Sequence, residues 1–341
     1  MHPNTKTAGW LSVFVCLLVP AVSTGQAGSD SKEKLHKAIE YFKGAQYDNA
    51  ISLLAELSTD KTLDKESLRE VQLGLGRVYL AKNLSDKARA SLENLLKLEP
   101  PAVSLDPDLE SPPLMRIYYD VRKEKSGSLQ VERTDPGIKT IAILDFSNRS
   151  IDEKERYDPM EKGFAELMIS QLNGSVNLKV VERERINWLL GEINLENDPT
   201  KFDPETAVRV GKLLGVHSVL FGSFIKTRND LWIGTRLVKV ETGEILSTDQ
   251  IKGDPADFFE LAENLSAKVA KGINVTISEA DIQKGTATKS LDAMMSYSEG
   301  LIFLEKGDYK EAYDKFQQAL GQDPSYEKAR KKAESVKPLL G

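Results

Sequence analysis

Apolar and polar positions follow two different periods along this chain. In residues 31–100, and again in residues 290–341, apolar and small residues recur at the spacing of amphipathic helices. In residues 138–273, short runs rich in β-branched residues alternate with helical segments. The pattern therefore predicts a central α/β domain with a mixed sheet and covering helices, flanked by all-α helical hairpins.

The N-terminal helical region divides into two predicted hairpins, with breaks near residues 44, 59 and 83. In the second hairpin, small and large residues recur at fixed offsets, at Gly76, Tyr79, Ala88, Leu92, Leu95 and Pro100. These offsets resemble the tetratricopeptide (TPR) repeat, whose period is about 34 residues. The first hairpin is a more divergent copy, because no proline closes it.

The C-terminal region resembles the TPR pattern most fully. Its matching positions are Gly300, Phe303, Gly307, Tyr309, Ala312, Phe316, Ala319 and Pro324. The basic segment that follows, residues 325–339, is typical of a solvated capping helix that closes a stack.

Stacked hairpins of this kind present a concave surface that suits an extended peptide or a partner helix. The TPR resemblance places that surface on the first helix of each pair. The residues that would line it are Glu70, Leu73, Arg77 and Leu80 in the N-terminal region, and Met294, Tyr297, Leu301 and Leu304 in the C-terminal region. The alternative is that these side chains pack against neighbouring helices or the α/β domain.

Two linkers are predicted from composition: residues 101–137, which hold one helix near 114–123, and residues 274–289. Between them, the pattern predicts a strand-helix-strand unit, two further helices, three strands joined by tight turns, and a last helix. The predicted strands are 139–146, 178–181, 216–225, 231–240 and 244–252, and the predicted helices are 160–172, 185–195, 204–214 and 255–270.

Three segments of the central domain stand out in order and spacing: IAILDF at 141–146, VVERERINWLLGE at 180–192 and LGVHSVLFGS at 214–223. Together they resemble the curli production assembly family, the CsgG-like domain. That resemblance implies a lipid-anchored oligomer that forms an outer-membrane secretion channel from two long hairpins in each subunit. This chain departs from the pattern, because residues 148–158 are short and charged and residues 231–240 are flanked by tight turns.

Composition narrows the classes of function. A net charge of −6 leaves no broad basic field, so nucleic-acid binding is not expected. A single cysteine, Cys16, and three histidines supply neither a disulfide framework nor a cysteine-based zinc site. We therefore expect no cofactor, no metal ion and no enzymatic activity.

Three candidates for chemistry each have a structural interpretation as well. Asp145 ends the first predicted strand, where catalytic carboxylates often lie, but no second carboxylate follows at the spacing of a magnesium site. The charge run 182–185 is expected to place acidic groups near a helix start, with its arginines pairing locally; binding of a partner subunit is the alternative. His217 is expected to be a packed, hydrogen-bonded residue rather than a metal ligand.

The N-terminus is typical of a secretory signal peptide, predicted for residues 1–27. Lys6 supplies positive charge, residues 11–19 are mostly apolar, and Gly25-Gln26-Ala27 offers small residues for cleavage. The apolar stretch is shorter than the roughly 20 residues that span a bilayer. We therefore expect an exported protein, periplasmic or associated with the outer membrane of a bacterium.

These observations favour a cell-envelope scaffold or adaptor that binds a protein or extended peptide on its TPR surface, in secretion or surface assembly. One alternative is a subunit of a CsgG-like export channel. Another is an enzyme with Asp145 in its site. A homo-oligomer through the α/β domain and peripheral contact with the outer membrane remain open.

Overall fold

The computed structural model describes residues 24–98, 105–128, 130, 137–195 and 203–340. Most of the predicted signal peptide, including Cys16, lies outside these residues, as does Pro100 of the second predicted hairpin.

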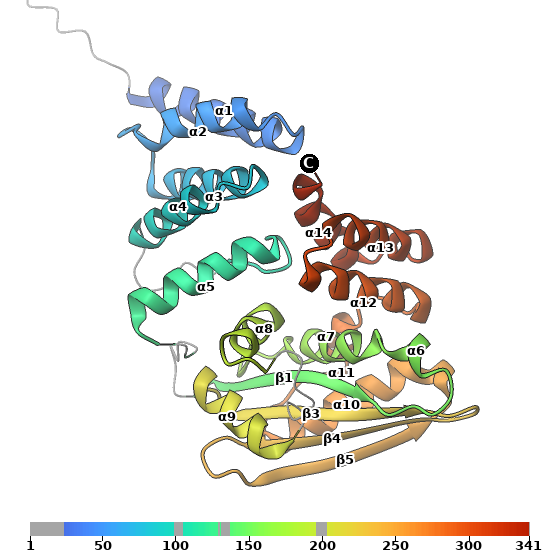
Figure 1. Ribbon diagram of the computed structural model, residues 1–341. Coiled ribbons are helices and arrows are strands. Elements are labelled where there is room, and N and C mark those ends of the chain that lie inside the picture. The colour runs from blue at the N-terminus through green and yellow to red at the C-terminus, as the bar shows by residue number, and fades with distance from the viewer. Residues whose placement is uncertain (1–23, 99–104, 129, 131–136, 196–202, 341) are drawn as a thin grey trace, which may run out of the picture.

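A five-stranded mixed sheet forms the centre of the molecule, in the order β2-β1-β3-β4-β5 (Figure 1). β1 pairs in parallel with β2 and β3, and β3, β4 and β5 are antiparallel. The strands are β1 (Lys139–Asn148), β2 (Leu178–Val180), β3 (Ser218–Lys226), β4 (Leu231–Lys239) and β5 (Ile245–Gly253). The predicted mixed sheet is therefore confirmed.

Side chains along each strand point alternately to the two faces of the sheet, so both faces can carry an apolar core, and helices cover both of them. Along β1, Ile141 and Ile143 belong to one hydrophobic core with α7 and α10, whereas Ala142 and Leu144 belong to another with α8 and α9. The helices of the domain are α6 (Lys154–Tyr157), α7 (Met160–Leu172), α8 (Arg183–Glu192), α9 (Pro204–Leu214), α10 (Phe258–Gly272) and α11 (Glu279–Gly285). α11 occupies part of the segment expected to be a linker.

Helical hairpins flank the sheet on one side, with the N-terminal helices and the C-terminal helices in two adjacent groups (Figure 1). The N-terminal group is α1 (Thr24–Lys43), α2 (Tyr47–Ser58), α3 (Lys65–Ala81), α4 (Ser85–Leu98) and α5 (Pro112–Ser126). The C-terminal group is α12 (Leu291–Lys306), α13 (Tyr309–Gln322), α14 (Glu327–Val336) and the short 3-10 helix η3 (Lys337–Leu339).

Glycine permits the closest helix contact in the C-terminal group. A Cβ atom added at Gly300 of α12 would lie 2.5 Å from the Phe316 ring of α13, so only glycine fits there. Phe316 is fully buried in the core that α12, α13 and α14 share. Gly300 and Phe316, which the sequence pattern lists as separate positions, therefore contact each other directly.

Both helical groups dock on the α/β domain and also touch each other. α5 reaches α8 through Trp188, whose Nε1 donates to Asp120 at 2.8 Å. α12 packs on α7. The Tyr47 hydroxyl at the start of α2 donates to the Pro338 carbonyl of η3 at 2.7 Å, and the C-terminus is drawn beside α1 in Figure 1. The N-terminal and C-terminal helical groups therefore contact each other as well as the α/β domain.

Candidate protein-interaction site

The N-terminal part of the predicted partner surface lies on α3 and is partly open. Glu70 is exposed, and Leu73 is half-buried against the core that α4 and α5 share. Arg77 forms a two-pronged ion pair with Glu110, in which Nε donates to Oε2 at 2.9 Å and a terminal nitrogen contacts Oε1. Leu80 is buried. Glu70 and Leu73 lie one helical turn apart, and Arg77, also half-buried, is held by its ion pair with Glu110.

The structure places the C-terminal part of that predicted surface in the core. The exposed fractions of Met294, Tyr297, Leu301 and Leu304 are 2%, 0%, 4% and 4%. Met294 packs in the core that contains α7 and α10, and the other three pack among α12, α13 and α14. The side chains contact their own chain because this face of α12 is turned inward. We therefore leave these four residues out of the partner surface.

Asp145 lies within a cluster of alternating charges that joins β1, α7 and α8 to α12. Lys162 Nζ lies 3.1 Å from Asp145 Oδ2, and Arg183 lies 3.4 Å from Oδ1. Glu305 of α12 binds both cations, at 2.5 Å from Lys162 and 2.8 Å from Arg183. Burial opposes the charge of Arg183, but Asp145 and Glu305 outweigh burial and raise its pKa.

The cavity beside Asp145 has a volume of about 10 Å³, enough for about one water molecule. Its lining residues are Ile143, Leu144, Asp145, Arg183, Ile186, Asn187 and Leu190. Both carboxylate oxygens of Asp145 lie within ion-pairing distance of a cation. The geometry therefore gives Asp145 an ion-pairing role.

A second buried charge cluster joins α7 and α8 to α14. Glu166 pairs with Lys328, and Glu184 Oε1 lies 2.5 Å from Lys332 Nζ. Lys332, whose exposed fraction is 1%, also donates to the Pro107 carbonyl at 2.9 Å. Burial raises the pKa of Glu184 against the influence of Lys332. At Glu166 burial acts in the same direction, but Lys328 outweighs it and lowers the pKa.

These clusters correct two expectations from the sequence. The helix expected to be a solvated cap, α14, is anchored by two of its lysines. The arginines of the charge run at the start of α8 were expected to pair locally, but Arg183 reaches α12. Glu184 reaches α14, and the side chain of Glu182 makes no capping hydrogen bond to α8. The charge run therefore fastens the C-terminal helices to the α/β domain.

His217 has the hydrogen-bonded role that the sequence predicts. Its Nδ1 lies 3.1 Å from the Thr140 amide nitrogen and 2.9 Å from the Thr140 hydroxyl. In the part of the chain that the structure describes, no group of three or more His, Cys, Asp and Glu side chains could hold a metal ion. None of the helices in the described segments is long and apolar enough to cross a membrane.

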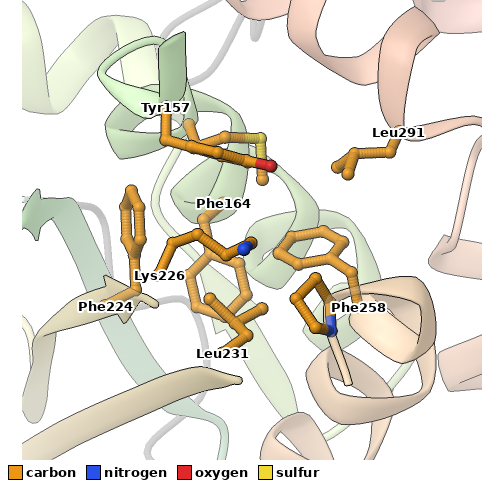
Figure 2. A pocket seen from close by; sticks show the side chains of 9 residues that line it. Tyr157, Phe164, Phe224, Lys226, Leu231, Phe258 and Leu291 are labelled. Atoms are coloured by element: carbon orange, nitrogen blue, oxygen red, sulfur yellow. The ribbon is translucent and has the colours of Figure 1, made fainter. Parts of the chain in front are cut away.

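An apolar pocket of about 20 Å³ lies between the ends of β3 and β4 and helices α7 and α10. Figure 2 shows Lys226 crossing it between the Tyr157 ring and Leu231. The ammonium group contacts the carbonyl of Thr227 and, at 3.3 Å, that of Arg228. The lining residues are Tyr157, Met160, Phe164, Phe224, Lys226, Leu231, Pro255, Phe258 and Leu291. A space of this size is too small for a ligand larger than a water molecule.

Comparison with known proteins bears on the central domain. Residues 122–227 match the family model described as "Curli production assembly/transport component CsgG", which supports a CsgG-like domain. The match begins within α5 and ends just after β3, whereas the predicted domain spans residues 138–273. No curated protein matches the chain.

The chain is also similar to several solved structures, at low TM-scores. The LpoB C-terminal domain from Escherichia coli is 15% identical, with 36% of this chain and 87% of that chain covered and a TM-score of 0.28. The corresponding domain from Salmonella enterica is 13% identical, with 39% and 91% covered and a TM-score of 0.26. Lipoprotein GNA1162 from Neisseria meningitidis is 16% identical, with 41% and 99% covered and a TM-score of 0.28. The family model thus assigns residues 122–227, about a third of the chain, to a CsgG-like domain.

Proposed function

We propose that this protein is an exported, non-catalytic scaffold of the bacterial envelope whose N-terminal helices hold another protein or an extended peptide. The observation that carries the proposal is a strip on α3, outside the CsgG-like segment, where Glu66 and Glu70 are exposed and Leu73 is half-buried. These positions lie three and four residues apart and therefore share one face of the helix.

The packing of α2, α3 and α4 supports a TPR-like arrangement. A Cβ atom at Gly74 of α3 would lie 3.2 Å from Leu54 of α2, and one at Gly76 would lie 3.6 Å from Leu92 of α4. Small residues on α3 thus let it pack closely against helices on two sides, as stacked hairpins require. An acidic strip with one apolar side chain suits a peptide that carries a basic and an apolar residue.

The charge clusters support a role without catalysis. The carboxylate that the sequence offers for chemistry, Asp145, is engaged by Lys162 and Arg183 beside a cavity of about 10 Å³. The matched family is described in terms of assembly and transport, and a part in secretion or surface assembly is our proposal for this chain.

Co-purification from a cross-linked envelope tests the proposal. The variant Glu70→Lys reverses one charge on the α3 strip, and Glu311→Lys makes the same change at an exposed position of α13. We expect Glu70→Lys to lower the recovery of the partner severalfold and Glu311→Lys to leave it unchanged. Equal recovery with both variants would contradict a binding role for α3.

A further inference from the structure

Helices cover one face of the sheet only in part. Ile233 of β4 points to the core with α7 and α10, so its neighbours along β4, such as Gly234, point to the opposite face. α9 lies on one end of that face, where a Cβ atom added at Gly211 would lie 2.4 Å from Val240 and 2.7 Å from Val219 (Figure 1). A Cβ atom added at Gly234 would meet nothing within 4 Å. The face opposite α10 is therefore open at Gly234.

Small and polar side chains line up across the open part of this face. Ser147 of β1, Ser223 of β3 and Gln250 of β5 are paired in register with Gly234 and share its face. This row lies about 13 Å along β3 from the residue that contacts α9. Because serine and glycine have short side chains, another polypeptide can approach the sheet closely here. We call this row, together with the rows through Trp232 and Arg236 on either side of it, the uncovered sheet face.

Apolar side chains are accessible on the uncovered sheet face. Ile225 of β3 pairs directly with Trp232 of β4. Both are half-buried, and neither belongs to a hydrophobic core of the described chain. Tryptophan and arginine are among the residues most enriched at the positions that dominate binding energy in protein interfaces. Ile225 and Trp232 therefore give the face an apolar anchor point.

The charged side chains on the uncovered sheet face are cations. Arg236 of β4 is exposed and forms no ion pair with a described residue. Arg149, just after β1, is also exposed, and its Nε donates to Ser147 Oγ at 3.3 Å, which places it on the same face. Lys252 of β5 is paired with Trp232 in the sheet and lies 3.2 Å from Asp230 in the β3–β4 turn. Two arginines on this face are thus available to carboxylates of another molecule.

The carboxylates of the neighbouring strands point elsewhere. Asp249 of β5 is opposite Thr235, which is buried on the face that α10 covers. Asp145 of β1 is engaged by Lys162 and Arg183. The chain as a whole carries a net charge of −6, so this local excess of cations runs against the overall balance. A cationic face of this kind is complementary to an acidic partner.

The details of the face favour an acidic helix over a nucleic acid. Lys252 Nζ lies 4.7 Å from the centre of the Trp232 ring, so the ammonium group occupies a ring face on which a base would stack. Three cations are also few for a phosphate backbone. Helices cover the other parts of this sheet, and a helix is the element that buries a sheet face in α/β folds.

We propose that the uncovered sheet face binds an acidic amphipathic helix of another protein. The apolar side of that helix packs against Ile225 and Trp232 over the short side chains at Ser223 and Gly234, and its carboxylates pair with Arg149 and Arg236. Arginine and carboxylate groups form two-pronged, charge-assisted hydrogen bonds. The face belongs to the sheet and the strip of the proposed function belongs to α3, so either can fail while the other holds.

Titration of the full chain with a synthetic helix tests the proposal. The probe is a peptide of about five helical turns with leucine along one side and glutamate on the others, and the control peptide has lysine in place of every glutamate. We expect the glutamate peptide to shift the indole NMR signal of Trp232, which the variant Trp232→Phe identifies, and to bind more weakly as salt is added. No shift with the glutamate peptide, or an equal shift with the lysine peptide, would overturn the proposal.

Two pairs of variants locate the binding site. Arg236→Glu should raise the dissociation constant of the glutamate peptide roughly tenfold, whereas Lys310→Glu, at an exposed position of α13, should leave it unchanged. Gly234→Gln fills the open space above the sheet and should also weaken binding roughly tenfold with no loss of thermal stability. Gly321→Gln, where a Cβ atom likewise meets nothing within 4 Å, is its control. Equal affinity in all four variants would refute the site.

A single-stranded oligothymidylate with the same number of negative charges as the glutamate peptide distinguishes the two classes of partner. We expect it to bind more weakly than the peptide, with no dependence on Gly234→Gln. Tighter binding of the oligonucleotide, lost in Arg236→Glu, would make the face a nucleic-acid site and the proposal wrong.

Discussion

The buried lysine of α14 offers the sharpest test of how the C-terminal helices are held. Replacing Lys332 by Met keeps a long side chain in a site that is 1% exposed, so little cavity forms. The change removes the ion pair with Glu184 and the hydrogen bond to the Pro107 carbonyl. Removing one partner of a buried pair costs about 3–5 kcal/mol, because the other charge stays buried.

Hydrogen exchange of the α14 amides measures this cost locally. A loss of about 3 kcal/mol corresponds to roughly 100-fold faster exchange if α14 opens as a unit. Lys331→Met, which changes a neighbouring lysine with no ion pair among the described residues, should leave exchange near the wild-type rate. Adding Glu184→Gln to Lys332→Met should recover most of the protection, since the stranded charge is removed. Equal exchange in Lys331→Met and Lys332→Met would refute the reasoning.

Three further predictions concern other contacts. The folded-state pKa of Glu166 lies below its ordinary value of 4.5. Its pair with Lys328 therefore stabilises the fold above pH 4.5, and this stabilisation is lost as pH falls through the lowered pKa. Glu166→Gln should reduce this loss of stability at low pH, as measured by urea titrations at a series of pH values. Tyr47→Phe removes the hydroxyl that donates to the Pro338 carbonyl and should cost about 1 kcal/mol, seen as faster hydrogen exchange in η3. Gly300→Ala should cost about 1–3 kcal/mol by overpacking, whereas Gly321→Ala, where a Cβ atom meets nothing within 4 Å, should be neutral or stabilising in thermal unfolding.

The helices and strands of this fold can be predicted from local sequence patterns. The way in which they pack against one another cannot. The β-branched runs predict the strands because alternation along a strand depends on neighbouring residues, and β3, β4 and β5 match the predicted strands to within a few residues. Glycine at position 300 is likewise readable, since its large partner, Phe316, lies in the next helix.

The candidate site was harder to predict because its contacts join distant segments. Glu184 and Lys332 are separated by 148 positions, and nothing near either residue indicates a partner. A lysine-rich helix is typical of a solvated surface, so the burial of Lys332 could not be inferred from its neighbours. Tyr297 was misplaced for the same reason: the helical pattern shows that it lies on an apolar face, but not whether that face meets a partner or its own chain.

The hydrogen bond between Tyr47 and Pro338 spans 291 positions of sequence. In an open-ended array of helical hairpins the terminal units fray first, because each has only one neighbour. Here the first hairpin also contacts the last turn of the chain, so the described helices behave as a closed loop. Fraying at either end therefore removes a contact from the other, and a bulky fusion at the C-terminus should loosen the helices nearest the N-terminus.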